Sequence, residues 1–224
     1  TQQARAAINS EANFPIAPAA VAEPHAPADA PAALRPVLTA LAGVWQGTRG
    51  LDVKPEADGP AKQAYIERIE LQPIDPQSNG PQLFYGLLYH VHITKPDDVE
   101  TYHSQVGYWL WEPATGMIMH SLTIPRGQTA LAIGHAKAKI AIRGAELVIH
   151  NAAFDVGFLN REFELVAKRG STENGICSNP FLEHAFRTDE FRIRVRINDN
   201  GTWTYEQDTI LKIHGQDELF HHKD

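Results

Sequence analysis

The stretch that decides the fold is FRIRVRINDNGTWTYEQDTILKI, residues 191–213. From 191 to 197 its apolar residues alternate with arginines, so one face of an extended strand is buried and the other faces water. The turn Asp199-Asn200-Gly201 offers the positive-φ residues of a tight hairpin. The apolar face then continues on a returning strand at Trp203, Tyr205, Leu211 and Ile213. The stretch therefore predicts an antiparallel hairpin with one buried face.

The same period of two runs back to Gly43, punctuated by Gly, Pro, Asn and Asp. Further strands are predicted at residues 44–51, 63–72, 82–94, 101–111, 116–124, 128–135, 139–150 and 158–168. With the hairpin they make ten. Because no helical pattern lies between them, parallel crossovers are not available, and we expect an all-β, ten-stranded antiparallel meander barrel.

A ten-stranded barrel has a consequence for function. A closed barrel widens with strand number, and about eight strands already give an interior that side chains only just fill. We therefore expect a cavity whose walls are mainly aromatic and aliphatic, suited to a flat or elongated apolar guest. A sandwich of two five-stranded sheets would explain the same pattern without a cavity, and the pattern leaves both architectures open.

The chain divides at about residue 33. Residues 13–33 are mostly Ala and Pro, and the prolines interrupt any helix that the alanines start. A short helix follows, with Leu34, Val37, Leu38 and Leu41 on one face. We therefore expect an N-terminal arm over residues 1–33 and a β-barrel domain over residues 34–224.

Composition excludes several classes of protein. Lys+Arg 20 against Asp+Glu 27 gives a net charge of −7, and no basic run marks a nucleic-acid interface. No apolar stretch approaches the roughly 20 residues that cross a bilayer, and the first thirty residues lack the order of a signal peptide. A single cysteine, Cys177, rules out an internal disulfide framework, so we expect a cytoplasmic protein.

The 11 histidines are almost the only soft ligands, so imidazole would hold any metal. His90 and His92 lie two apart on one strand and could share an ion, although two histidines on the polar face of a strand explain them as well. His103 shares a strand face with Gln105, Gly107 and Trp109, which suggests a pocket wall in which glycine makes room for a ligand.

Two further features stay open on the residues alone. His221 and His222 follow Leu219 and Phe220 beyond the last predicted strand, and this tail could fold back over the mouth of a barrel. Cys177 has no evident base or helix N-terminus to lower the pKa of its thiol, so a passive loop thiol is the favoured interpretation.

Four segments together resemble the nitrobindin family, the THAP4-like haem-binding β-barrels whose shape is similar to that of lipocalins and fatty-acid-binding proteins. Residues 41–47 (LAGVWQG) resemble the family's L-x-G-x-W-x-G opening, and residues 65–69 (YIERI) its second strand. Residues 103–109 (HSQVGYW) are similar to H-x-E-x-G-Y/F-W/F, and residues 219–222 (LFHH) to its L-x-x-H signature. The resemblance covers about residues 34–222 in order.

Carried over residue by residue, the resemblance implies His222 as the ligand of haem iron, with His221 beside it and His103 on the pocket wall. It also implies Thr123 and Thr209 as haem-binding residues. The cofactor would be haem b, with one axial histidine and an open sixth position. The implied activities are the binding of nitric oxide and the isomerisation of peroxynitrite to nitrate. We expect small-molecule ligands and a monomer or homodimer.

The chain departs from the family pattern at three places. The family's W-x-G-x-G reads here as WQGTRG, residues 45–50, which is one residue longer, and Gln105 stands where the family has Glu. Residues 169–186 form an additional loop. Two alternatives remain beside haem: a carrier of a fatty acid or another apolar molecule without iron, and a metal-dependent enzyme that uses His90 and His92.

Overall fold

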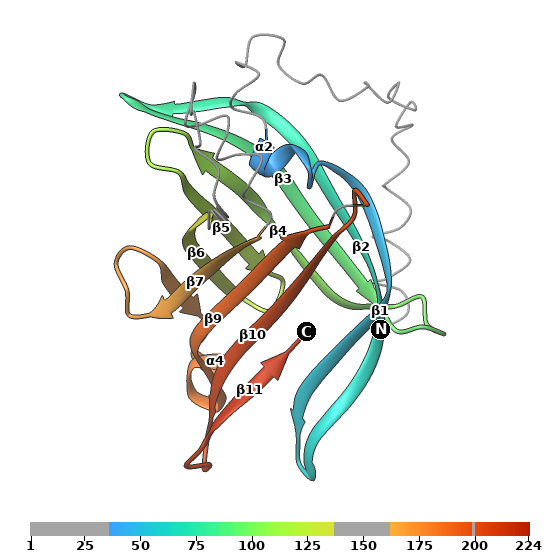
Figure 1. Cartoon of the computed structure of the whole chain (residues 1–224). Helices are drawn as coiled ribbons and strands as arrows, with labels where there is room; N and C mark the ends of the chain where they lie inside the picture. The colour runs from blue at the N-terminus through green and yellow to red at the C-terminus, as the bar shows by residue number, and fades with distance from the viewer. Residues whose placement is uncertain (1–35, 137–161, 199) are drawn as a thin grey trace, which may run out of the picture.

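One β-sheet closes on itself and forms a barrel in the part of the chain that the structure describes (Figure 1). The computed structural model describes residues 36–136, 162–198 and 200–224. The strands are β1 Gly43–Glu56, β2 Gly59–Asn79, β3 Gln82–Thr94, β4 Thr101–Glu112, β5 Met117–Ile124, β6 Gln128–Ala136, β7 Glu162–Arg169, β8 Gly175–Ser178, β9 Phe186–Ile197, β10 Trp203–Ile213 and β11 Leu219–Lys223. The predicted antiparallel barrel is confirmed, and the closed sheet is not the two-layer sandwich that the pattern also allowed.

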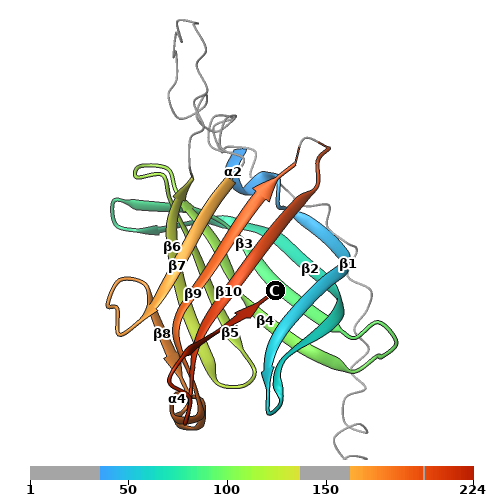
Figure 2. The same ribbon diagram turned by 60° about the horizontal axis from the view of Figure 1, so that its bottom comes forward.

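The order around the barrel is β1-β11-β10-β9-β7-β8-β6-β5-β4-β3-β2, as the view in Figure 2 shows. One departure from a simple meander lies at β8, which pairs parallel to β7 and antiparallel to residues 128–130 of β6. The upper half of β6, residues 133–136, pairs with β7 instead. Residues 169–186, expected to be a loop, thus contain β8 and a short helix and form part of the wall.

The number of strands differs from the prediction. Eleven strands lie among the described residues, where the sequence predicts ten. The predicted strand at residues 139–150 falls outside the described residues. β8 and β11 were not predicted because four and five residues are too few to show a period of two.

Among the described residues, two short helices flank the sheet. α2, Pro36–Thr39, is the predicted N-terminal helix, and Leu38 and Leu41 bury their side chains in the core beneath it. α4, Pro180–Ala185, was not predicted; it begins after Asn179, whose side chain accepts hydrogen bonds from the backbone N–H groups of residues 181 and 182. Among the described residues, no helix is long and apolar enough to span a membrane.

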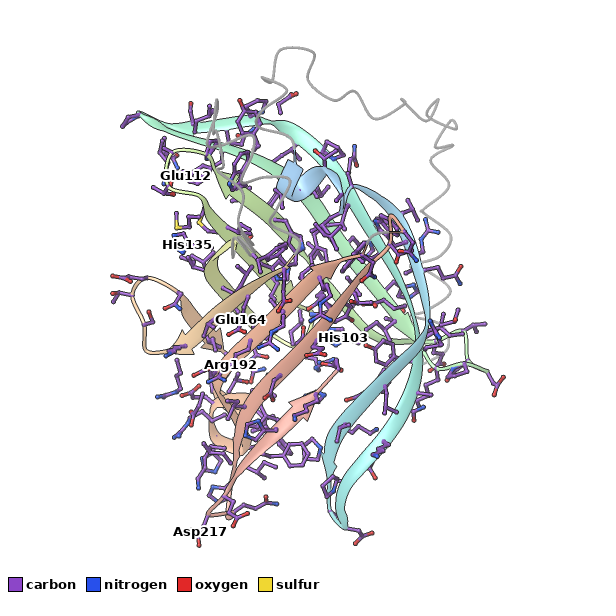
Figure 3. All side chains as sticks on the ribbon, in the orientation of Figure 1. His103, Glu112, His135, Glu164, Arg192 and Asp217 are labelled. Atoms are coloured by element: carbon purple, nitrogen blue, oxygen red, sulfur yellow. The ribbon has the colours of Figure 1, made fainter. Side chains whose placement is uncertain are left out.

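The predicted alternation is clear in β7 and β9. Phe163, Leu165, Ile193 and Val195 are buried inside the barrel. Their neighbours face solvent: Glu164 and Arg192 stand on the outer face in Figure 3, and Arg194 pairs with Glu164 at 2.8 Å. The inner faces therefore supply the core, and the outer faces of these strands carry an exposed ladder of ion pairs.

The additional residue in WQGTRG is a β-bulge. The pairing of β1 with β2 shifts register between Gly47 and Gly50. At Gly50 a Cβ atom would lie 2.1 Å from Cε2 of Tyr65, so the ring of Tyr65 occupies the place that any other side chain would need. Thus the longer motif bends β1 and lets its backbone lie against Tyr65, a residue of the cavity.

Candidate functional site

A cavity of about 290 Å³ lies inside the barrel at the end where β11 closes it. Its wall is mostly apolar, with Ile93, Leu122, Ile124, Ile176, Phe191 and Leu211 among the lining residues. The polar lining groups come mainly from β1, β4, β10 and β11, with others from β2, β6 and β9, and Figure 3 shows one of them, His103, inside the ring of strands. The predicted cavity with a mostly apolar wall is thus present.

β11 decides which of the two adjacent histidines faces the cavity. It pairs with β10 from Lys212↔Leu219 to Asp208↔Lys223, and successive side chains of a strand point to opposite faces. His222 lines the cavity, whereas His221 points outward and its Nδ1 lies 2.8 Å from Oδ2 of Asp208. The tail beyond the predicted strands is therefore itself a strand, and its register separates the two histidines.

Two carboxylates surround the ring of His222. Nε2 of His222 lies 2.7 Å from Oδ1 of Asp52, a buried residue of β1, and 3.9 Å from Oδ1 of Asp224. The hydroxyl of Tyr102 donates to the other oxygen of Asp52 at 2.5 Å. The hydrogen bond to Asp52 fixes the ring of His222 against β1. It engages Nε2, so Nδ1 is the remaining ring nitrogen.

The imidazole of His222 and the two carboxylates shift one another's pKa values. Burial alone would raise the pKa of Asp52, but the hydrogen bonds from His222 and Tyr102 lower it below its usual value. Burial would likewise lower the pKa of His222, but the Asp52 hydrogen bond and the charges of Asp224 and Asp52 raise it. Burial raises the pKa of Asp224 to about 6. Asp52 is therefore an ionised acceptor that orients the imidazole.

His103 also lines the cavity, but its ring is in a different state. Burial and the nearby charge of Arg126 lower the pKa of His103 to about 4, so the imidazole is neutral at pH 7. A terminal nitrogen of Arg126 lies 3.1 Å from Nδ1 of His103 and donates to it. Because that lone pair is already engaged, His103 suits the wall of the pocket better than the coordination of a metal.

The remaining predicted residues divide between the cavity and the surface. Thr209 lines the cavity, but Thr123 is exposed on the outer face of β5, and its hydroxyl bonds the carbonyl of Gln128. His90 is exposed and His92 bonds Thr101, so both lie on the outer face, and the described residues bring no third metal ligand to them. Cys177 is an exposed, free thiol.

Several polar groups of the site were not predicted. Asp52, Arg126 and Tyr205 come from strands or turns whose pattern marks no function. Glu67 did carry a signal: it stands between Tyr65 and Ile69 on the buried face of β2, where the alternation calls for an apolar residue. Burial of a carboxyl group in the core costs free energy unless hydrogen bonds or opposite charges compensate it, and for that reason Glu67 indicates a functional site.

The residues present fit haem by the chemistry of their donors. An imidazole that ligates a metal commonly bonds a carboxylate through its other nitrogen, and His222 has that arrangement with Asp52. The apolar wall suits a porphyrin, and the cations Lys54 and Arg126, which line the same cavity, would suit its carboxylates. Asp52, His222 and Asp224 also bring ligand atoms within 4.8 Å of one another, as a small metal site would.

A closed β-barrel with a mostly apolar cavity defines a class of barrels that bind small molecules. Within that class, residues 34–224 match the family model of the THAP4-like, heme-binding beta-barrel domain. The chain therefore belongs to this family, and the resemblance found in its motifs is confirmed.

Comparison with solved structures supports the fold, and comparison with curated proteins finds one short similarity. The crystal structure of Rv2717c from M. tuberculosis superposes with a TM-score of 0.54 at 19% identity, over 87% of this chain and 95% of that one, and shows the same fold. The DNA polymerase III subunit epsilon is 58% identical over 36 residues in Escherichia coli K12 and 46% over 37 in Buchnera aphidicola. The chain spans only 15% and 16% of these curated relatives.

Proposed function

We propose that this protein binds haem b through His222, binds nitric oxide, and isomerises peroxynitrite to nitrate. The observation that carries the proposal is the placement of His222 on the cavity wall, with Nε2 held by the buried carboxylate of Asp52. Membership of the haem-binding family supports haem as the cofactor. In this proposal residues 34–224 are the functional domain.

In this proposal four lining residues besides His222 have a defined task. Bound haem would supply an iron that takes nitric oxide or peroxynitrite. Asp52 accepts from His222 and so orients the ring and increases its donor strength. Lys54 and Arg126 would pair with the carboxylates of the cofactor, and the neutral His103 offers a polar group without adding charge.

Titration with hemin tests the ligand, and adjacent histidines provide a matched control. The wild-type chain should develop a Soret band that saturates at one hemin per chain. His222→Ala should lose the band or weaken binding by at least about tenfold, whereas His221→Ala, whose imidazole faces away from the cavity, should titrate as the wild type does. Equal titrations of the two variants would refute the assignment of the ligand.

A separate measurement tests the chemistry. The hemin-loaded chain should convert peroxynitrite to nitrate faster than the same amount of hemin-free chain, and nitric oxide, by occupying the iron, should slow this conversion. A chain that binds hemin through His222 but leaves the yield of nitrate unchanged would keep the cofactor and exclude the isomerase.

The apolar wall also favours a second function, a carrier of an apolar molecule without iron. Nine lining side chains are alanine, leucine, isoleucine or phenylalanine, and they would pack against a fatty acid as well as against a porphyrin. A carrier should bind a fluorescent fatty acid with the same affinity in the wild type and in His222→Ala. Displacement of this probe by hemin in the wild type alone would favour haem.

A further inference from the structure

Three side chains form a hydrogen-bonded chain at the cavity, apart from His222. The hydroxyl of Tyr205, on β10, donates to Oε1 of Glu67 at 2.8 Å, and the hydroxyl oxygens of Tyr65 and Tyr205 lie 3.3 Å apart. Tyr65 and Tyr205 line the cavity, while Glu67 lies behind them with 6% of its surface exposed. The chain therefore runs from a buried carboxyl group to hydroxyl groups that a bound molecule can reach.

Counting protons fixes the polarity of this chain. A hydroxyl has one proton, so when Tyr205 donates to an ionised Glu67, the proton of Tyr65 is the one that joins the two tyrosines. Tyr65 then offers only lone pairs to the cavity. When Glu67 is protonated and donates to Tyr205, both tyrosine protons turn the other way, and Tyr65 offers a proton. The state of Glu67 thus sets what the cavity presents.

The surrounding packing holds these groups in place. The backbone of β1 at Gly50 lies so close to the ring of Tyr65 that a Cβ there would be 2.1 Å from Cε2. On the adjacent strands the amide of Gln105 donates to the hydroxyl of Tyr89 at 2.5 Å. Tyr65, Glu67, Tyr89 and Gln105 are each less than one tenth exposed. Since the packed rings cannot move far, protonation of Glu67 costs the least free energy when the hydroxyl protons of the two tyrosines rotate.

We propose that Glu67, Tyr205 and Tyr65 form a switchable binding subsite, which donates a hydrogen bond to a guest while Glu67 is protonated and accepts one while Glu67 is ionised. The guest is a small, mostly apolar molecule with a single hydrogen-bonding group: a carbonyl or similar acceptor in the first state, an N–H or O–H donor in the second. The subsite goes beyond the haem proposal, because none of its residues is the proposed ligand.

The charges around Glu67 put the switch near neutral pH. Burial raises the pKa of Glu67 to about 7, against the opposing hydrogen bond from Tyr205, and the charge of Asp224 raises it further. The titratable groups that face it are Tyr205 on β10, Tyr65 on β2, Tyr89 on β3 and Asp224 after β11. Burial raises the pKa of all three tyrosines, so their hydroxyls stay protonated and pass a proton without losing one.

Two neutral probes test the subsite in the full chain without added haem. Acetophenone only accepts hydrogen bonds and indole only donates them, and neither titrates between about pH 5.5 and pH 8.5. The dissociation constants of both should be measured by NMR titration at a series of pH values across this range. From the lowest to the highest pH the ratio of the two affinities should change by about a hundredfold in favour of indole, because acetophenone loses one net hydrogen bond and indole gains one, each worth about tenfold. Effects common to both probes cancel in this ratio.

Matched variants assign the change to the chain of three residues. The ratio should be independent of pH in Glu67→Gln, which keeps an acceptor for Tyr205, and in Tyr205→Phe, which breaks the link between Glu67 and Tyr65. It should remain switchable in Tyr85→Phe, whose ring packs against Trp111 and does not line the cavity. In Asp224→Asn the change should persist with a lower midpoint, because one charge that raises the pKa of Glu67 is gone.

Each outcome decides the proposal. A ratio that is constant with pH in the wild-type chain would overturn it without reference to any variant. A ratio that still changes in Glu67→Gln would overturn it too, since the switch would then reside elsewhere. Neither result touches the assignment of His222, which the hemin titration tests independently.

Discussion

Replacement of Glu67 by glutamine should change how the stability of the barrel depends on pH. Glu67 is 6% exposed, and burial raises its pKa from an ordinary value of 4.5 to about 7. Between these values the native chain holds a proton at Glu67 that the unfolded chain has released. The free energy of unfolding therefore falls as the pH rises through this window, because the native state binds the more protons.

The size of this effect follows from the two pKa values. They differ by about 2.5, and each step of one is worth about 1.4 kcal/mol, so ionisation of Glu67 should cost the folded state about 3 kcal/mol by pH 8. Glu67→Gln has no such cost. Between pH 4.5 and pH 8 the wild type should therefore lose about 3 kcal/mol of stability relative to Glu67→Gln.

Urea unfolding at a series of pH values measures this difference directly. Glu70→Gln is the matched control, because Glu70 lies on the same strand but faces solvent in a pair with Arg68. The control should run parallel to the wild type at every pH. If the difference between wild type and Glu67→Gln stayed constant to within about 0.5 kcal/mol from pH 4.5 to 8, the reasoning about this buried carboxyl group would be wrong.

Two other substitutions test the packing and the buried histidine. Gly50→Ala should destabilise the barrel by about 1–3 kcal/mol in urea unfolding, since its Cβ would overlap the ring of Tyr65, whereas Gly47→Ala, with no atom closer than 3.8 Å, should cost less than about 1 kcal/mol; equal losses would contradict the bulge argument. His120 is fully buried without a hydrogen-bond partner, stacked on Trp109 at 4.0 Å, and burial lowers its pKa to about 3. Because the unfolded chain takes up a proton at His120 at a higher pH than the native chain does, stability is lost as the pH falls from 6.5 towards 3, by up to about 5 kcal/mol. His120→Phe should therefore unfold at a lower pH than the wild type in an acid titration monitored by circular dichroism. An unchanged acid midpoint would refute this.

The barrel was largely predictable because its signal is local. Alternation along residues 191–213 fixes the inner and outer faces of β9 and β10 before any contact is known. The sequence does not predict β8 and β11, because their few residues form strands only by pairing with longer neighbours. Their assignment depends on contacts across the sheet, which the pattern of a short segment does not contain.

The site was predictable only in part, for a similar reason. The motifs placed His103, His222 and Thr209 among the candidates, and all three line the cavity. They could not distinguish Thr209 from Thr123, because the face that a threonine occupies depends on the register of its strand. Nor could they reveal Asp52, which lies 170 residues from His222 in sequence and meets it only because β11 closes the barrel against β1.

The central claim is that His222 donates its imidazole to haem iron. The most direct measurement is the resonance Raman spectrum of the ferrous haem complex in the region of the iron–histidine stretching mode. The band should be present in the wild type and in His221→Ala, absent in His222→Gly, and restored in His222→Gly when free imidazole is added. Persistence of the band in His222→Gly without imidazole would show that another histidine is the ligand and would contradict the claim.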